Sequence, residues 1–421
     1  MTKQRHNSAR RTALIGARAA LLLLGFAVAA QAQAPPQSRV YREGGYWVEE
    51  TNGDMAAAHA VRVRADLGSI SVTGPGSGEM RYIEGAGPGA VRYTVRKRVS
   101  ANSEEQARQL FDSYHFSASR SEGQLVFTGD VPSREWRRGS VQIAIVSASQ
   151  LSDVKVSTRG GDINVSHIKG RAEIETGGGR VETDDIGENV NISSGGGNVH
   201  IGTVKGAVEM RSGGGNVEMA NAGGNALVRT GGGNVNIDTV HGDLVVETGA
   251  GNLNVKTVHG GIKASTGGGS LDLGDIGGQV AAETGGGSIR LRSGGGVVAE
   301  TGAGLIQCYN VKRGMKASTG SGGITVEFVG KRSDFTSSHL EAGVGDIVVY
   351  LPSDLGVKVD ANIDFANGHG IQSDFSGLRI TQSSGFGPGQ VSAEGNLNGG
   401  GPTLELHTTT GNIMIRRARQ Q

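Results

Sequence analysis

A short glycine-rich phrase returns at a fixed interval through the middle of this 421-residue chain, between Thr158 and Val326. Each copy reads Ser or Thr, then Gly, then Gly or Ala, then Gly, and in most copies two aliphatic residues follow at alternate positions. A period this strict predicts a stack of similar structural units rather than one globular core. The interval from Thr284 to Thr301 is one residue shorter than the others. The seven strict copies follow an 18-residue period and open at Thr176, Ser194, Ser212, Thr230, Thr248, Thr266 and Thr284.

Each 18-residue unit consists of two nine-residue halves, and each half reads as a four-residue turn followed by a strand of about five residues. In the unit 230–247, Val235 and Ile237 alternate with polar residues, which puts them on one face of a strand. The second half carries a further apolar residue in its turn, as at Val240. We expect each unit to direct four or five aliphatic side chains inward.

One such unit is too small to fold alone, so the units are expected to stack and bury a continuous core. The sequence predicts an all-β fold, a parallel β-solenoid of two-strand, 18-residue coils with irregular β-rich N- and C-terminal caps and one short helix. A flat antiparallel meander, with the glycine-rich segments as hairpin turns, fits the same half-repeat. The two differ because residues 18 apart stack directly in a solenoid and lie two strands apart in a meander.

One outward column of asparagines favours the solenoid, because stacked Asn side chains can form hydrogen bonds along a ladder. The Ser and Thr residues that open the units are predicted to stack in the same way. The asparagines are also our candidates for surface contacts. They are Asn198, Asn216, Asn234 and Asn252.

The N-terminal segment reads as an export signal. Residues 1–32 hold five basic residues, an apolar run from Ala19 to Ala30 and a small-residue cleavage site before Gln33. The apolar run is shorter than the roughly 20 residues that span a bilayer, so we expect no membrane span in the mature chain. Removing the signal lowers Lys and Arg from 41 to 36 against 40 Asp and Glu, a net charge of −4.

The rest of the chain divides into three predicted regions. Residues 33–154 are expected to form a β-rich N-terminal cap with one helix, which opens on a capping box at Ser103. Residues 155–330 carry the solenoid repeats. Residues 331–421 are expected to form the distal coils and the C-terminal cap, with Gly385–Gly401 as a glycine-rich loop.

Charge and cysteine content exclude several functions. The acidic balance argues against nucleic acid as a partner. Two basic strings, Arg92–Arg98 and Arg416–Arg419, are short and read as solvated strand edges. The only cysteine, Cys308, falls on an inward position of its repeat and is predicted to be a core residue rather than a nucleophile.

The repeats also lack the residues of known glycine-rich sites. A calcium-binding β-roll needs an Asp where this chain has aliphatic residues such as Val199 and Val217. A phosphate-binding loop needs a Lys followed by Ser or Thr after its last glycine. We attribute the glycines to turns that need positive φ. His241 and His259 are expected to stack as an exposed pair, because flanking repeats add no metal ligand.

Three segments carry a resemblance to a known family. The repeated Thr-x-Gly-Asp/Asn-Ile/Val phrases, the segment Tyr350–Val357 and the segment Thr410–Ile413 resemble the bacterial β-strand-repeat family of unknown function labelled "putative adhesin". The resemblance covers roughly Ser69 to Arg416. It implies a β-solenoid and export, and it brings no catalytic residues.

We therefore expect an exported, non-enzymatic β-repeat protein, an adhesin-like scaffold or binding module that is periplasmic, secreted or at the cell surface. Its expected partner is a protein or glycan of the cell envelope. We predict no catalytic residue, cofactor or metal. A polysaccharide-active β-helix enzyme and an envelope-stress signalling partner remain as alternatives, and the sequence does not predict an oligomeric state.

Overall fold

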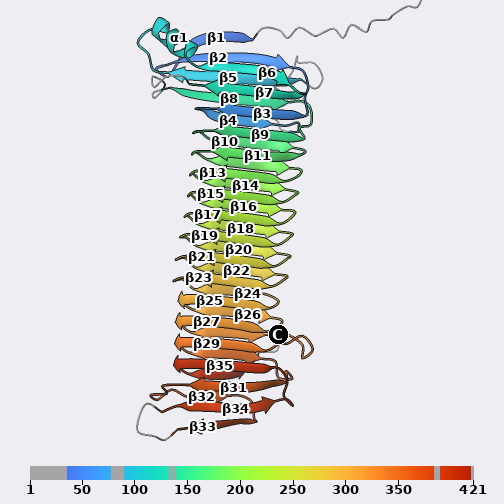
Figure 1. The fold of residues 1–421 in the computed structure, drawn as a ribbon, viewed down its shortest axis with the longest axis vertical. Helices are drawn as coiled ribbons and strands as arrows, with labels where there is room; N and C mark the ends of the chain where they lie inside the picture. Colours follow the sequence, from blue (N-terminus) through green and yellow to red (C-terminus); the bar gives the residue numbers. More distant parts are fainter. Residues whose placement is uncertain (1–35, 77–89, 132–135, 137–138, 384–388, 419–421) are drawn as a thin grey trace, which may run out of the picture. The chain divides into compact units, whose positions relative to one another are not determined.

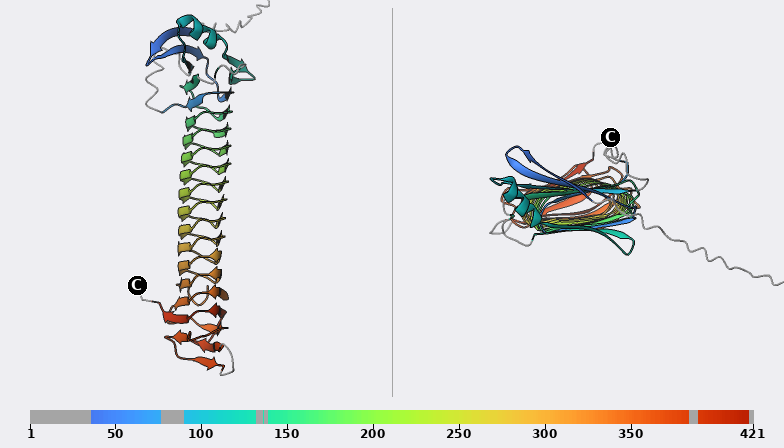
Figure 2. Two further views of the ribbon diagram at one scale, coloured as in Figure 1. Left: turned by 90° about the vertical axis from the view of Figure 1, so that its left-hand side faces the viewer. Right: turned by 90° about the horizontal axis from the view of Figure 1, so that it is seen from above.

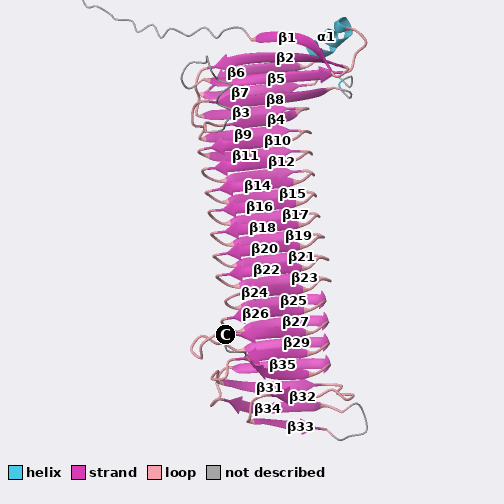
Figure 3. Cartoon of the chain, turned by 180° about the vertical axis from the view of Figure 1, so that it is seen from behind, coloured by secondary structure: helices cyan, strands magenta, loops and turns pink. Residues whose placement is uncertain are grey.

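The computed structural model describes residues 36–76, 90–131, 136, 139–383 and 389–418. The predicted export signal at 1–32 lies outside these residues. The described part of the chain is almost entirely β-structure, with one α-helix (Figure 3). No helix in these described ranges is long and apolar enough to cross a membrane.

The repeats fold as a β-solenoid in which each coil gives one strand to each of two facing sheets, called sheet A and sheet B (Figure 1; Figure 2). Among the repeats, pairing within each sheet is parallel, so that Val235 lies between Val217 and Leu253. Residues 18 apart therefore stack directly, which confirms the predicted solenoid and excludes the meander.

In the repeats, sheet A contains β10 (Ile163–Ile168), β12 (Val181–Ile186), β14 (Val199–Val204), β16 (Val217–Ala222), β18 (Val235–Val240), β20 (Leu253–Val258), β22 (Leu271–Ile276), β24 (Ile289–Ser293), β26 (Ile306–Val311) and β28 (Ile324–Phe328). Sheet B contains β9 (Asp153–Thr158), β11 (Arg171–Thr176), β13 (Val190–Ser194), β15 (Val208–Ser212), β17 (Ala226–Thr230), β19 (Leu244–Thr248), β21 (Ile262–Thr266), β23 (Val280–Thr284), β25 (Val297–Ala303) and β27 (Met315–Ser321).

A typical coil buries five aliphatic side chains between the sheets, at the upper end of the four or five that the alternation predicts. In one coil these are Val235, Ile237, Val240, Leu244 and Val246, each at most 1% exposed. The prediction that Val240 lies in a turn was wrong, because β18 runs through this residue. The strand continues until the Val240 side chain reaches the core.

The three glycines of the turn that opens at Thr230 are there for different reasons. Gly233 has φ of +102°, a conformation that favours glycine. Gly231 does not have positive φ, but a Cβ there would lie 2.5 Å from the carbonyl oxygen of Gly213 in the preceding coil. Gly232 faces open space, and Ala250 occupies its equivalent position one coil later. Positive φ therefore explains only the last glycine of the three.

The Thr residues that open the repeats are buried rather than stacked outside. The Thr248 hydroxyl donates to the carbonyl of Ala250 at 3.1 Å and lies 3.1 Å from that of Gly233 in the preceding coil. Thr248 is 5% exposed. The column satisfies turn carbonyls within and between coils, which corrects the expectation that it forms an outward ladder.

The shortened coil, which opens at Thr284, omits a core side chain. Where the preceding coil has Ile276 at the end of β22, this coil has the buried Gly294, and β24 has five residues against six in β22. A Cβ at Gly294 would lie 3.0 Å from Cγ2 of Val280, so the shorter coil has closed the space.

At the N-terminal end, the strands do not stack in the order in which they follow one another in the sequence. Strands β3 (Ala60–Ala65) and β4 (Ser69–Thr73) form a coil against β9 and β10, although β4 ends at Thr73 and β9 begins only at Asp153. The segment between them extends the sheets outward through β8 and β5 in sheet A and through β7 and β6 in sheet B. The remaining strands of this end are β1 (Gln37–Glu43), β2 (Tyr46–Met55), β5 (Val91–Val99), β6 (His115–Ser121), β7 (Gln124–Asp130) and β8 (Ser140–Ser147).

The predicted helix is α1 (Glu104–Asp112). The Ser103 hydroxyl accepts the N–H of Gln106 at 3.2 Å, and the Gln106 side chain accepts the N–H of Asn102. At the other end, the Lys97 ammonium donates to the carbonyl of Phe111 at 3.0 Å. The helix is thus fixed to β5 at its C-terminal turn.

At the C-terminal end the last coil of the chain is inserted rather than added. Strand β35 pairs with β29 on one side and β31 on the other (Figure 1; Figure 3). In sheet A, β36 lies between β30 and β32. The predicted loop Gly385–Gly401 contains strand β34, because Val391, Ala393 and Leu397 alternate into the core. The strands of this end are β29 (Ser338–Val344), β30 (Ile347–Leu351), β31 (Val357–Ile363), β32 (Ile371–Ser373), β33 (Leu378–Gln382), β34 (Val391–Leu397), β35 (Thr403–Thr410) and β36 (Ile413–Arg417).

Candidate functional site

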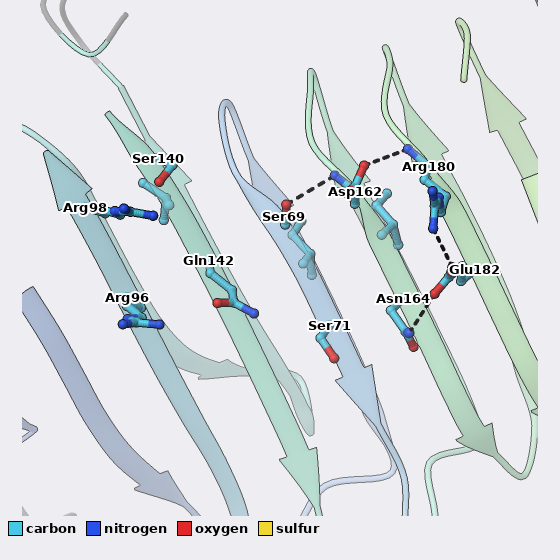
Figure 4. A pocket seen from close by; sticks show the side chains of 13 residues that line it. Ser69, Ser71, Arg96, Arg98, Ser140, Gln142, Asp162, Asn164, Arg180 and Glu182 are labelled. Atoms are coloured by element: carbon cyan, nitrogen blue, oxygen red, sulfur yellow. Dashed lines mark hydrogen bonds and ion pairs between the residues drawn. The ribbon is translucent and has the colours of Figure 1, made fainter. Parts of the chain in front are cut away.

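A polar hollow of about 540 Å³ lies on the outer face of sheet A, where the N-terminal strands meet the first coils. Five adjacent strands form its floor, in the order β5, β8, β4, β10 and β12 (Figure 4). Because side chains alternate along a strand, the apolar residues of these strands enter the core and the polar ones face the hollow. The polar lining is Arg96 and Arg98 from β5, Ser140 and Gln142 from β8, Ser69 and Ser71 from β4, Asp162 and Asn164 at β10, and Arg180 and Glu182 at β12.

The carboxylates on the β12 side of the hollow are already engaged. Asp162 Oδ1 accepts the backbone N–H of Arg180 at 2.7 Å. The Arg180 guanidinium lies 3.3 Å from Glu182, and Asn164 Nδ2 donates to the same carboxylate at 3.5 Å. Contacts within the chain therefore hold both carboxylates in place.

The opposite side of the hollow is cationic. Arg96 forms an ion pair with Glu43 of β1, and the Arg98 guanidinium lies 3.9 Å from the centroid of the Tyr46 ring. Arg98 has no carboxylate partner within the described ranges. Its charge is therefore available at the rim.

Between these two sides lie polar groups that the fold leaves free. The side chains of Ser71, Ser140 and Gln142 have no hydrogen-bond partner among the described residues. Hydroxyl and amide groups can both donate and accept. The hollow therefore offers unfilled hydrogen-bonding capacity on a floor of paired β-strands.

This arrangement suits recognition better than catalysis. General acid–base chemistry needs a group free to exchange a proton with substrate. The two carboxylates here are held by guanidinium, amide and backbone donors, and the described lining contains neither His nor Cys. Its chemistry is that of a surface that hydrogen-bonds a polar ligand.

The predicted asparagine ladder is present, in a different form from the one expected. Oδ1 of Asn198 accepts the backbone N–H of Asn216 at 3.0 Å, and Asn216 and Asn234 repeat this contact with the next coil at 2.9 Å. Asn252 accepts the N–H of Ser270 in the same way. The ladder thus joins side chains to backbone, and the exposed Nδ2 groups have no partner in the described part of the chain. None of these asparagines lines the hollow.

Two other predictions concern His241, His259 and Cys308. His241 and His259 are exposed and stack with ring centroids 4.7 Å apart. Cys308 is fully buried, and burial raises the pKa of its thiol to about 12, so the nucleophilic thiolate is disfavoured. All three residues lie where the sequence placed them.

Sequence reasoning missed the hollow because it treated Arg92–Arg98 as a solvated strand edge. Strand β5 is interior, with β2 on one side and β8 on the other. Lys97 points inward and lies 2.8 Å from Glu49, while Arg96 and Arg98 point outward. The alternation within this string was a usable signal, but the strands that complete the hollow come from separate parts of the chain.

Comparison with known proteins gives several distant structural matches and one family. A "putative cell adhesion protein" from Clostridium sporogenes is 9% identical, with 88% of this chain and 100% of that one covered and a TM-score of 0.17. "Putative adhesin" structures from Bacteroides fragilis (14% identity, coverage 71% and 96%, TM-score 0.18) and Parabacteroides merdae (11% identity, coverage 72% and 93%, TM-score 0.25) also match. No curated protein matches the sequence. The family described as Toastrack DUF4097 matches residues 91–416, most of the chain, and this chain therefore belongs to that family.

Proposed function

We propose that this chain is an exported, non-enzymatic scaffold of the adhesin-like kind, which binds a hydroxyl-rich glycan of the cell envelope in the hollow on sheet A. The observation that carries the proposal is the row of free polar groups at Ser71, Ser140 and Gln142, beside the unpaired Arg98. Paired strands hold the backbone of these residues in place, so binding has to order only their side chains.

The asparagine ladder extends this proposal along the solenoid. The Nδ2 donors of Asn198, Asn216, Asn234 and Asn252 form an outward row at the spacing of the coils. An extended ligand held in the hollow would meet these donors as further, weaker contacts.

Labelled intact chain should be applied to an array of bacterial envelope polysaccharides, together with a variant carrying Ser140→Ala and Gln142→Ala. The matched control carries Asn236→Ala and Asn254→Ala, which are outward positions of the same sheet away from the hollow. We expect the hollow variant to lose about 5- to 150-fold in affinity, since each of the two lost hydrogen bonds contributes about 0.5–1.5 kcal/mol. The control should bind as the unmodified chain does.

Two outcomes would contradict the proposal. Equal binding by both variants would show that the hollow is not the contact surface, and binding to no polysaccharide would remove the ligand class. Release of shorter glycans by the intact chain, abolished by Glu182→Gln, would favour the polysaccharide-active enzyme instead.

A further inference from the structure

One edge of sheet B is left open at the C-terminal end of the solenoid. The strands of sheet B follow here in the order β35, β31, β34 and β33, and β33 pairs only with β34 among the strands of the described ranges (Figure 1). Sheet A ends earlier, since its last described strand here is β32, which lies beside β36. Strands β34 and β33 therefore extend sheet B beyond the last described strand of sheet A.

The backbone groups on this open edge follow from the register of the β33–β34 hairpin. The Ser383 N–H donates to the carbonyl of Gln390 at 2.9 Å, and the two strands pair antiparallel. In an antiparallel pair, alternate residues direct their N–H and C=O groups toward the partner strand. Arg379 and Thr381 therefore direct theirs toward β34, as Ser383 does. The residues whose N–H and C=O groups point away from β34 are Leu378, Ile380 and Gln382.

The side chains of β33 leave this edge unprotected. Folded proteins usually block an open edge with charged residues, prolines or a covering element. The strand reads Leu-Arg-Ile-Thr-Gln and carries one charge, on Arg379. Ile380 at its centre is 50% exposed, whereas Leu378 packs partly buried against the core. An exposed β-branched side chain beside free backbone donors and acceptors suits pairing with another β-strand.

The N-terminal end has two of these protections. The outermost strands there, β1 in sheet A and β6 in sheet B, carry charged residues such as Arg39, Glu43 and Arg120. Helix α1 lies at the same end and packs its buried Phe111 against the core (Figure 1). A head-to-tail contact between β33 of one copy and the N-terminal end of the next is therefore disfavoured.

The sequence of β33 instead matches a second copy of itself. When two β33 strands pair antiparallel about a two-fold axis at Ile380, all five residues of each strand are paired. Ile380 then lies opposite Ile380, and both direct their N–H and C=O groups into the contact. Arg379 lies opposite Thr381, whereas an axis at Arg379 would set the two arginines against each other. Charge and register therefore both favour the axis at Ile380.

We propose that two copies of this chain associate through β33, so that their B sheets join edge to edge at the C-terminal ends. A two-fold contact uses the same surface on both copies and stops at a dimer. The hollow on sheet A takes no part in this contact, so the dimer does not depend on the proposed glycan binding.

Sedimentation velocity of the intact chain over a range of concentrations measures the association, and we expect a monomer–dimer equilibrium. Ile380→Pro removes one edge N–H from each copy, and loss of these two hydrogen bonds should weaken the dimer about 5- to 150-fold. Ile380→Lys sets two ammonium groups against each other and should also weaken it. The matched control is Val298→Lys, because Val298 is 43% exposed on β25, an interior strand of sheet B. This control should dimerise as the unmodified chain does.

Disulfide formation tests the register. The two-fold axis places the Cα atoms of the two copies of residue 380 about 5.5 Å apart, within the roughly 4.4–6.8 Å that a disulfide needs. Ile380→Cys should therefore give covalent dimers under mild oxidation. Gln382→Cys lies on the same edge, but its two copies are roughly 14 Å apart in this register and should not cross-link. The native Cys308 is buried in both variants.

Four results would overturn the proposal. The unmodified chain could stay monomeric at every concentration, or it could form assemblies that grow beyond two copies, which would place a different edge opposite β33. Val298→Lys could weaken the dimer as much as Ile380→Lys does. Gln382→Cys could cross-link where Ile380→Cys does not. Sedimentation of the unmodified chain keeps the test valid even if a variant fails to fold.

Discussion

The repeats and the two ends of this solenoid are built from the same coil but are assembled differently. Within the repeats, a strand pairs with its counterpart in the next repeat along the chain, as Val217 does with Val235. At the ends, some adjacent strands are distant in the sequence, since Ala60 pairs with Asp153 and Ser338 with Leu404. The repeats therefore present regular columns, whereas the ends bring unrelated residues together. The proposed glycan site lies at one of these ends.

The sharpest contrast comes from removing one coil from each region. Deleting residues 230–247 joins Arg229 to Thr248 and restores the phrase, so the shortened solenoid should fold with a modest loss of stability. Ending the chain at Pro402 removes a coil from between two others, together with four buried aliphatic side chains that contribute about 6–12 kcal/mol. We expect residues 331–402 to become sensitive to protease.

Urea unfolding and limited proteolysis of the two deletion variants measure this difference. The comparison fails if the variant ending at Pro402 keeps a protected C-terminal region, or if deletion of residues 230–247 unfolds the chain.

A second contrast lies within a single turn. Gly231→Ala places a Cβ 2.5 Å from a backbone oxygen, so the stacked turns must separate, and we expect a loss of about 3 kcal/mol in the free energy of unfolding. Gly232→Ala enters open space and should change it by less than about 0.5 kcal/mol. Urea unfolding midpoints of the two variants measure this difference. Equal losses of stability in both variants would refute the explanation that Gly231 is needed because the turns stack closely.

These contrasts show what the sequence can predict. The repeat gives the coil, the inward Val235 and Ile237, and the asparagine column, because each depends on residues close in the sequence. The repeat does not predict that β35 is inserted, because β29 could equally have paired with β31, the next strand in sheet B. The hollow depends on a similar pairing, because β4 and β10 are adjacent in the sheet but distant in the sequence.

The two ladders of the repeats should differ in strength. Thr248→Val leaves buried turn carbonyls without their donor and should cost about 1–2 kcal/mol. Asn234→Ala removes an acceptor from an exposed N–H that water can reach, and should cost roughly 0.5 kcal/mol. Thermal unfolding of both variants tests the order, and a larger loss for Asn234→Ala would reverse our assignment of the buried ladder as the stronger.

The smallest expected effect is electrostatic. A hydrogen bond from Arg229, one coil away, lowers the pKa of Glu247. A depressed pKa stabilises the fold above the ordinary value of 4.5, and this contribution is lost as the pH falls from there through the lowered pKa. Glu247→Gln should therefore be slightly less stable than the unmodified chain at neutral pH, and acidification should close the difference. A difference that grows on acidification would contradict this account.

The most direct test of the central claim asks which strand lies beside β30. Outward-facing Val348 pairs with Met414 of the inserted strand, and Met414 pairs with Gln372. A disulfide needs Cα atoms about 4.4–6.8 Å apart, which adjacent strands allow and strands two apart, at roughly 9.6 Å, do not. We predict that Val348→Cys with Met414→Cys forms a disulfide under mild oxidation and that Val348→Cys with Gln372→Cys does not. The reverse result would show that the coils stack in chain order and would contradict the insertion of the last coil.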